Sequence, residues 1–182
     1  MIFNHITDKK RYYLPLIGIV LAIAYGCTTV PKNAVSLEIP FVAQTATNQC
    51  GATALAMAFQ YYGIDYNPSN LEQEVYIPVL KGSPMILLAE AATRRNLSCT
   101  STNLDLLGIK NTLTASNIPI IYLKPTSTHT VGHFAVVTGI DNNLKKIAIH
   151  GEAKPDLWIN VRRLLKQSTH ARFPTLILKP QD

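Results

Sequence analysis

The sequence predicts an α+β domain, with helices in its first half and an antiparallel sheet in its second. Stretches rich in alanine and leucine, separated by proline and glycine signals, fill residues 50–96, whereas runs of β-branched residues dominate residues 118–150. Helices first and strands afterwards are typical of this class. The composition agrees with one globular domain, because 47% of the 182 residues are hydrophobic and 15% are charged, which excludes a disordered or collagen-like chain.

Residues 1–26 have the pattern of an export signal. Three basic residues at positions 9–11 precede an apolar run over 12–24, which is shorter than the about 20 residues that a membrane-crossing helix needs. The run ends in the letters AYGC, which resemble the lipobox of bacterial lipoproteins, so Cys27 is the expected site of lipidation. An uncleaved N-terminal anchor is the alternative.

Either alternative places the domain in the cell envelope, beside a membrane. Thr28 stands where an aspartate would resemble the inner-membrane retention signal, so we expect a lipid-anchored protein of the outer membrane that faces the periplasm. Residues 27–36 are polar, contain a proline and lack periodicity, which predicts a lipidated tether. The folded domain is then expected over residues 37–182.

The charge pattern excludes one class of partner. The net charge of +6 includes the three cations of the signal segment, and the rest of the chain has neither a block of lysine and arginine nor basic residues interleaved with aromatic ones. Nucleic acid is therefore not an expected partner.

Five helices are predicted, three of them from a capping residue. Asn48 is the expected cap of a buried, alanine-rich helix over 50–63, and Asn103 is the expected cap of another over 104–115. The pair Ser83-Pro84 predicts a cap followed by proline at the first helical position, in a helix that ends near residue 96. The remaining two helices are expected over 68–79 and 156–165.

Strands are predicted around and after these helices. An extended approach covers residues 37–44, and strands are expected over 97–102, 118–123, 133–140, 144–150 and 174–178. Residues 141–143, with the letters DNN, are a turn signal, so the strands on its two sides should pair as an antiparallel hairpin.

A cysteine at the start of the buried helix is the first candidate for chemistry. The positive end of the helix dipole favours the thiolate of Cys50, which makes the sulfur nucleophilic. Gln44, six residues upstream, could donate its amide hydrogen to the oxyanion that attack by this thiolate creates. The alternatives are that Cys50 is a small buried apolar residue or that it forms a disulfide with Cys99 in an oxidising compartment.

The second candidate is His133, which opens the apolar strand predicted over 133–140. Its imidazole is suited to general-base catalysis, although a lone histidine at a strand end is more often an ordinary surface residue. The sequence has no C-x-x-C pair, so no metal site is expected.

Taken together, the segments PFVAQ, QCGATALAMAFQYYG and GHFAVVTGID resemble the papain-like cysteine peptidases of clan CA, family C thirty-nine, which remove double-glycine leaders from bacteriocin precursors. The resemblance covers about residues 37–178. It implies a helical lobe that carries Cys50, packed on an antiparallel sheet that carries His133. It also implies that Gln44 is the oxyanion donor, Cys50 the nucleophile and His133 the general base, with no cofactor. We therefore expect Cys50 to be a reduced thiol of low pKa that is not bridged to Cys99.

The third catalytic position departs from the family pattern, which has an aspartate or asparagine on the strand after the histidine. Here that stretch reads IHGE, over residues 149–152. If the hairpin turns on residues 142–143, Glu152 lies opposite His133 and His150 lies on the diagonal. Glu152 is then the best candidate to orient the imidazole, and His150 is the second.

These inferences predict a membrane-anchored cysteine endopeptidase. Its expected substrate is an exported polypeptide or leader peptide, cleaved after a glycine-rich or double-glycine sequence, and secretion-system components are expected partners. Two alternatives remain open. One is a non-catalytic peptide-binding lipoprotein that assists secretion, which the missing aspartate or asparagine favours; the other is a papain-like acyltransferase that uses the same cysteine and histidine with an amine acceptor.

Overall fold

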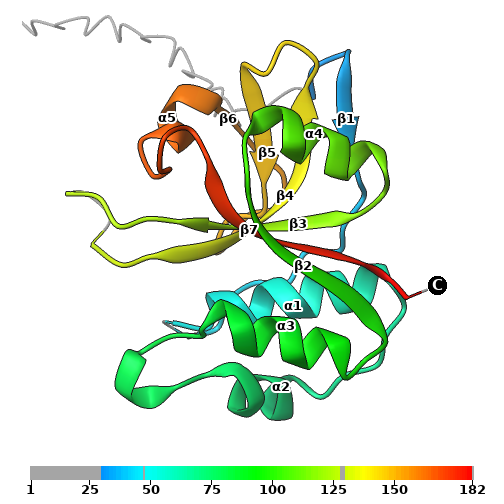
Figure 1. Ribbon diagram of the computed structural model, residues 1–182, viewed down its shortest axis with the longest axis vertical. Coiled ribbons are helices and arrows are strands. Elements are labelled where there is room, and N and C mark those ends of the chain that lie inside the picture. The colour runs from blue at the N-terminus through cyan, green and yellow to red at the C-terminus, as the bar shows by residue number, and fades with distance from the viewer. Residues whose placement is uncertain (1–29, 47, 128–129, 182) are drawn as a thin grey trace, which may run out of the picture.

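The computed structural model describes residues 30–46, 48–127 and 130–181, which form a helical lobe and a sheet lobe (Figure 1). The helical lobe holds α1 (Cys50–Tyr61), α2 (Pro68–Val75) and α3 (Met85–Thr93), with a 3-10 turn, η1 (Pro78–Leu80). The sheet lobe also carries α4 (Leu106–Thr114) and α5 (Val161–Leu165). The predicted α+β class is therefore confirmed.

Within the described residues, seven strands form the sheet, and every pair of neighbours is antiparallel. Their order across the sheet is β2-β7-β3-β4-β5-β6, and β1 pairs with β4. The strands are β1 (Ala34–Ser36), β2 (Leu97–Leu104), β3 (Ile118–Leu123), β4 (His133–Asp141), β5 (Lys146–Ile149), β6 (Leu157–Asn160) and β7 (Phe173–Pro180).

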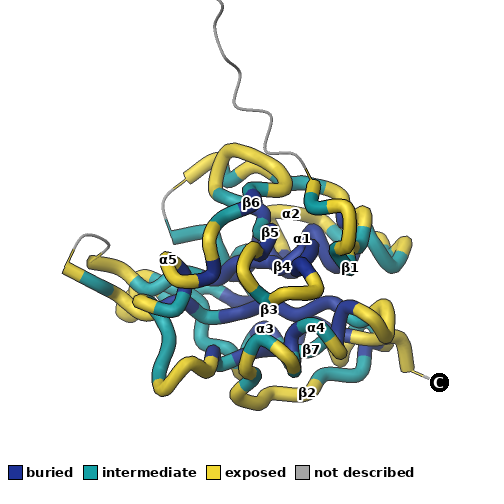
Figure 2. The backbone as a smooth tube through the Cα atoms, turned by 90° about the horizontal axis from the view of Figure 1, so that it is seen from above, coloured by how far each residue is buried: buried dark blue, intermediate teal, exposed yellow. Residues whose placement is uncertain are grey.

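The central strands β3 and β4 face a hydrophobic core on each side. On one side, Ile120 and Val136 pack in a core with α1, α2 and α3. On the other side, Ile121 and Val137 pack in a core with α4 and α5. Alternate residues of a strand point to opposite faces, so one pair of strands contributes to both cores. Figure 2 shows buried backbone through α1 and β4, the two elements that begin with Cys50 and His133.

The composition of α1 explains its central place. Residues 51–59 are all buried, and the alanines among them let neighbouring elements approach the helix on several sides. Gly51 is required at one such approach, because a Cβ atom there would lie 2.6 Å from the Cβ atom of Ser83. The N-terminus of α1 is therefore held against the segment that leads into α3.

None of the three residues predicted to cap a helix does so. Asn48 does not cap α1, because its backbone is left-handed, with φ of 71°, and Gln49 occupies the N-cap position. Asn103 lies inside β2, which is two residues longer than predicted. Asp105 caps α4 instead, and its Oδ1 accepts a hydrogen bond from the backbone N–H of Gly108 at 2.8 Å.

The segment between α2 and α3 also differs from the prediction. The helix α2 ends at Val75 instead of continuing to residue 79, because the next residues become extended and Pro78 starts the separate turn η1. Ser83 is not a cap: Pro84, with an extended backbone, is the N-cap residue of α3.

Two strands form where none was predicted. The helix expected over 156–165 is helical only in its second half, because residues 157–160 pair with β5 as the edge strand β6. The strand β1 lies in the segment expected to be a tether, and its three residues pair with the end of β4. Pairing with a neighbouring strand outweighs local helix propensity in such short segments.

The turn between β4 and β5 is longer than the predicted two-residue turn. The buried carboxylate of Asp141 accepts hydrogen bonds from the backbone N–H groups of Lys145 and Lys146, at 2.7 and 2.8 Å. This side chain closes a wider loop, so that Ile140 pairs with Ile147.

A bulge then shifts the pairing once more along the hairpin. Val137 pairs with Ile149, and β5 ends there. Glu152 is therefore not a cross-strand partner of His133, and that part of the prediction is wrong. The bulge places one extra residue, Thr138, in β4, and β-bulges are common next to active sites.

None of the described helices combines the length and the apolar character that a membrane-crossing helix requires. Cys27 and the predicted export signal lie outside the described residues.

Candidate active site

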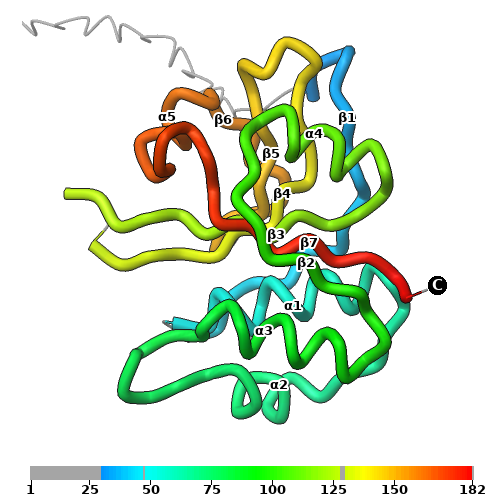
Figure 3. The backbone as a smooth tube through the Cα atoms, in the orientation of Figure 1, coloured from blue at the N-terminus to red at the C-terminus, as the bar shows by residue number. Residues whose placement is uncertain are grey.

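Four of the residues predicted to form the site meet at one cavity. Gln44, Cys50, His133 and Glu152 all line a cavity of about 450 Å³. They come from separate parts of the chain: the segment before α1, the first residue of α1, the first residue of β4 and the loop after β5. Figure 3 shows how the segment between β1 and α1 runs from the sheet lobe to the helical lobe and brings these parts together.

Cys50 lies between this cavity and a second one. The second cavity, of about 530 Å³, is lined by Tyr122 and Phe134 of the sheet lobe and by Met85 of the helical lobe. Both cavities also border Cys50 and Gly132, so they form two arms of a cleft that meet at the thiol. Such a cleft can hold an extended chain on both sides of the sulfur.

Gly132 is needed to keep this junction open. A Cβ atom at this position would collide with the side chain of Tyr122. The absence of a side chain therefore lets the backbone before His133 pass close to the tyrosine ring.

The thiol of Cys50 is less acidic than predicted. Burial raises its pKa above the ordinary value, and the Glu152 carboxylate raises it further, while the backbone N–H groups of Phe134, Gly51 and Cys50 itself lower it without offsetting the burial. The predicted low pKa is therefore wrong for the thiol on its own. An imidazolium at His133 is the group in this cavity that would favour the thiolate.

His133 has one carboxylate nearby. Its Nδ1 lies 3.9 Å from Oε1 of Glu152, too far for a direct hydrogen bond but close enough for electrostatic attraction when the imidazole is protonated. The His133 side chain is 23% exposed, whereas that of Glu152 is 73% exposed. Water screens so exposed a carboxylate, which makes Glu152 a weak partner for the imidazole.

His150, the second candidate for the orienting residue, has other partners. Its Nδ1 accepts a hydrogen bond from the backbone N–H of Asp156 at 3.2 Å, so its Nε2 carries the hydrogen and donates to the carbonyl of Ile39 at 2.8 Å. The ring is buried and meets Phe41 edge-on, at 5.4 Å between ring centroids. Both nitrogens of His150 are engaged with the backbone, so His150 does not orient His133.

Gln44 is tied to the loop that carries Glu152. Its backbone N–H donates to the carbonyl oxygen of Glu152 at 3.1 Å. A main-chain hydrogen bond thus joins the residue predicted to be the oxyanion donor to the residue whose carboxylate lies near His133.

Gln49 supports the site from outside its two cavities, and it was not predicted from the sequence. Its Oε1 accepts from the hydroxyl of Thr45 at 3.1 Å and from the N–H of Ala46 at 3.0 Å, and its Nε2 donates to Glu72 of α2 at 2.8 Å. It therefore holds the turn between Gln44 and the nucleophile against α2. A signal was present in the sequence, since Gln49 directly precedes the cysteine, but its partner is 23 residues away.

Both described cysteines are free, so the predicted absence of a bridge between Cys50 and Cys99 is confirmed. The thiol of Cys99 contacts the carbonyl of Leu97, two residues earlier on the same strand. In the parts of the chain that the structure describes, no group of three or more histidine, cysteine, aspartate or glutamate side chains is arranged to hold a metal ion.

We expect the Cys50 thiol to react only at higher pH when His133 is replaced. In His133→Ala, the pH midpoint for alkylation of Cys50 should rise above the ordinary value of about 8.5, because burial is no longer offset by an imidazolium. The wild-type chain should react at lower pH. Iodoacetamide rates at a series of pH values, read by mass spectrometry at Cys50, measure this. His170→Ala, at an exposed histidine, is the control, and identical midpoints in all three proteins would contradict the pairing.

Replacement of Gln49 should weaken catalysis more than binding. Gln49→Ala frees the turn at Thr45 and Ala46, so Gln44 is less well placed when the oxyanion forms, and kcat should fall by about tenfold with little change in KM. Gln60→Ala is the matched control on the same helix, because the Gln60 side chain makes an exposed hydrogen bond to the Tyr66 hydroxyl and does not line the cavity. Steady-state kinetics with a peptide substrate test this, and a rise in KM alone would contradict it.

Comparisons with known proteins agree with this geometry. The model of the Peptidase C39 family matches residues 38–171. The chain is 30% identical over 104 residues to the pediocin PA-1 transport/processing ATP-binding protein PedD of Pediococcus acidilactici, a match that spans 57% of this chain but only 14% of that protein.

Solved structures share the fold. A double glycine motif protease from an AMS/PCAT transporter, in complex with the leader peptide, has a TM-score of 0.62 at 22% identity and covers 84% of this chain and 97% of its own. The peptidase domain of Streptococcus ComA, a bi-functional ABC transporter, has a TM-score of 0.63 at 20% identity and covers 77% of this chain and 97% of its own. The family match over most of the chain confirms the resemblance seen in the sequence: the chain belongs to the Peptidase C39 family and is a cysteine peptidase.

Proposed function

We propose that this chain is a membrane-anchored endopeptidase that cleaves an exported polypeptide after a glycine-rich or double-glycine sequence. The observation that supports it best is the meeting of Gln44, Cys50 and His133 at one cavity, beside a second cavity that extends the cleft. The same three residues carry the resemblance to peptidases that remove leader sequences.

The reaction is acyl transfer to sulfur followed by hydrolysis. Cys50 gives its proton to His133, and the resulting thiolate attacks the carbonyl carbon of the scissile peptide bond. The side-chain amide of Gln44 and the backbone N–H of Cys50 donate to the oxyanion. His133 then protonates the leaving amine, and water activated by the same imidazole hydrolyses the thioester.

The raised pKa of Cys50 agrees with a thiol that is deprotonated only by transfer of its proton to His133. A buried thiol that stays neutral until its proton passes to His133 makes activity depend on the pair, not on the sulfur alone. Glu152 favours the imidazolium from a distance of 3.9 Å, so its contribution is electrostatic and small.

The proposed substrate class extends what is known of similar proteins. One solved relative is a double glycine motif protease in complex with the leader peptide, and the curated relative is a transport and processing protein. This chain matches only 14% of the length of that relative, and we propose that a transporter is a separate partner of this chain. An export signal favours a substrate that has already left the cytoplasm.

Cleavage should depend on Cys50 and His133 and less on Glu152. In single-turnover assays with glycine-rich leader peptides, Cys50→Ala and His133→Ala should abolish turnover, and Gln44→Ala should lower it by about 10²–10³. Glu152→Gln should have the mildest effect, because its carboxylate is mostly exposed.

Cys99→Ala is the matched control for the nucleophile and should keep full activity. Unchanged cleavage in Cys50→Ala would refute the mechanism. Tight binding of the peptides without cleavage would instead support a non-catalytic peptide-binding lipoprotein, and a product joined to an added amine would support an acyltransferase.

Lipidation of Cys27 should hold the protein at the membrane. Cys27→Ser should release the chain from the membrane fraction or leave an unprocessed precursor, because the thioether that carries the lipid cannot form. The intact mass of the mature wild-type protein tests this directly. An unmodified Cys27, or an N-terminus at another residue, would contradict the proposed anchor.

A further inference from the structure

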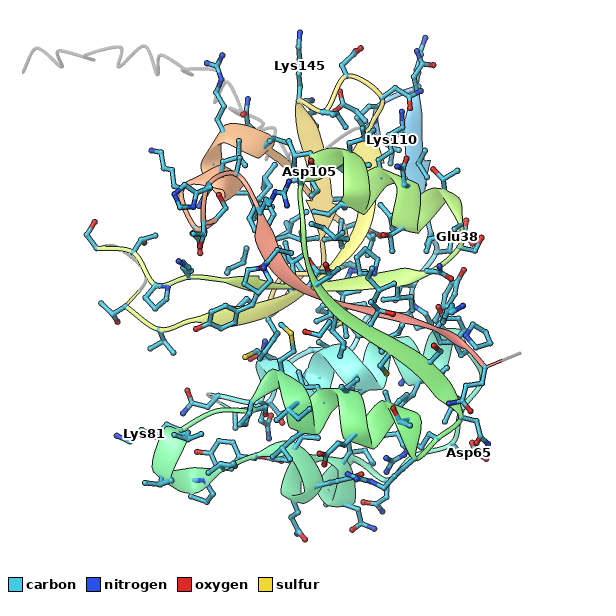
Figure 4. All side chains as sticks on the ribbon, viewed as in Figure 1. Glu38, Asp65, Lys81, Asp105, Lys110 and Lys145 are labelled. Carbon is cyan, nitrogen blue, oxygen red and sulfur yellow. The ribbon has the colours of Figure 1, made fainter. Side chains whose placement is uncertain are left out.

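Exposed cations gather at one end of the sheet lobe, around the turn between β4 and β5. Lys145 and Lys146 lie at the start of β5, Arg162 and Arg163 lie in α5, and Lys32 lies just before β1. All five side chains are exposed, and we call these five residues the basic end. Figure 4 shows Lys145 projecting from the end of the molecule opposite the helical lobe.

Hydrogen bonds and strand pairing bring these residues together. The N–H of Val161, next to the two arginines, donates to the carbonyl of Lys145 at 2.9 Å, and Lys146 pairs with Asn160. The N–H of Asn142, in the same turn, donates to the carbonyl of Asn33 at 2.9 Å. Three segments that are distant in sequence thus present their cations on one end of the fold.

The charge of the basic end is not neutralised from within. Among the described residues, none of its cations has a carboxylate within 4 Å, since every ion pair found involves other residues. Asp141, the nearest acid in sequence, is buried and accepts hydrogen bonds from two backbone N–H groups. Asp105 is exposed on the same lobe, but its carboxylate caps α4.

The charge also differs between the two ends of β5. Two exposed cations, Lys145 and Lys146, stand at its start, whereas two exposed carboxylates, Glu152 and Asp156, and one exposed cation, Lys154, follow its end, and Glu152 lines the active-site cavity. Lys146 and Glu152 are six residues apart, a separation of up to roughly 20 Å in extended chain.

The path of the chain adds a second, independent observation. The sequence places the proposed anchor, Cys27, seven residues before Ala34, the first residue of β1. Seven residues reach at most about 25 Å. Since β1 pairs with the end of β4 beside the turn, an anchor at residue 27 keeps Ala34, at this end of the sheet, within this distance of the bilayer.

We propose that the basic end docks on the headgroups of anionic phospholipids and turns the active-site cleft away from the membrane surface. The proposal rests on the membrane anchoring in the proposed function, whether the anchor is a lipid on Cys27 or the uncleaved apolar segment. Each lysine or arginine near an anionic surface strengthens the attraction by about fivefold, so five exposed cations suffice to orient a domain that is already tethered.

Amine labelling of the full-length protein in vesicles tests this orientation. The protein is reconstituted in phosphatidylcholine alone or with about one-third phosphatidylglycerol, treated with an amine-reactive reagent and analysed by mass spectrometry. Labelling of Lys145 and Lys146 should fall at least about threefold in the anionic vesicles and recover at high salt. Lys81, at the opposite end of the molecule in Figure 4, should be labelled equally in both.

Variants separate orientation from catalysis. Lys145→Glu with Lys146→Glu should abolish the protection of Lys32, while Lys81→Glu with Lys179→Glu, which changes the net charge equally, should preserve it. In detergent, the variant with both Lys145→Glu and Lys146→Glu should cleave peptide as fast as the wild type. The cleavage assay therefore tests the peptidase mechanism, whereas the labelling assay tests the orientation. Equal labelling of all lysines in both vesicle types would overturn the proposal. If duplex DNA, but not anionic vesicles, protected these lysines from labelling, the basic end would be a nucleic-acid surface and the proposal would be overturned.

Discussion

The catalytic geometry depends on the main-chain hydrogen bond between Gln44 and Glu152. The nucleophile belongs to the helical lobe and the histidine to the sheet lobe, so their separation is set by how the lobes are joined. The segment between β1 and α1 makes that connection, and its irregular backbone has few bonds of its own. The N–H of Gln44 fixes it to the loop after β5, within the cavity that both catalytic residues line.

Further contacts on either side of this bond hold the same segment. On the sheet side, the N–H of Leu37 donates to the carbonyl of Thr138 at 2.8 Å, and the buried ring of His150 holds Ile39. On the helical side, Gln49 fixes the turn before the nucleophile and reaches α2. The cleft is thus framed by polar contacts, whereas the lobes behind it are held by apolar packing on both faces of the sheet.

The sequence predicted those parts that depend on local pattern. The helix that begins at Cys50, the strand Ile118–Leu123 and the strand that begins at His133 form as expected, because an alanine-rich run and β-branched runs specify them strongly. Gln44, Cys50 and His133 were also found, through the resemblance, whereas Glu152 was chosen from a hairpin register that the structure does not have. What failed depends on particular hydrogen bonds and on burial, which the local pattern of residue types does not specify. The buried carboxylate of Asp141 lengthens the hairpin turn, and burial outweighs the helix dipole at Cys50.

The short strand β1 has a mechanical consequence for an anchored enzyme. Any pull on the chain before Ala34 acts first on the three residue pairs between β1 and β4, which lie at the end of β4 remote from His133. Beyond them, the bonds of Leu37 and Ile39 must break before the load reaches Gln44. If the chain is anchored as proposed, tension from the membrane would be borne first by these hydrogen bonds at the far side of the sheet, and the cleft would carry no load until they break.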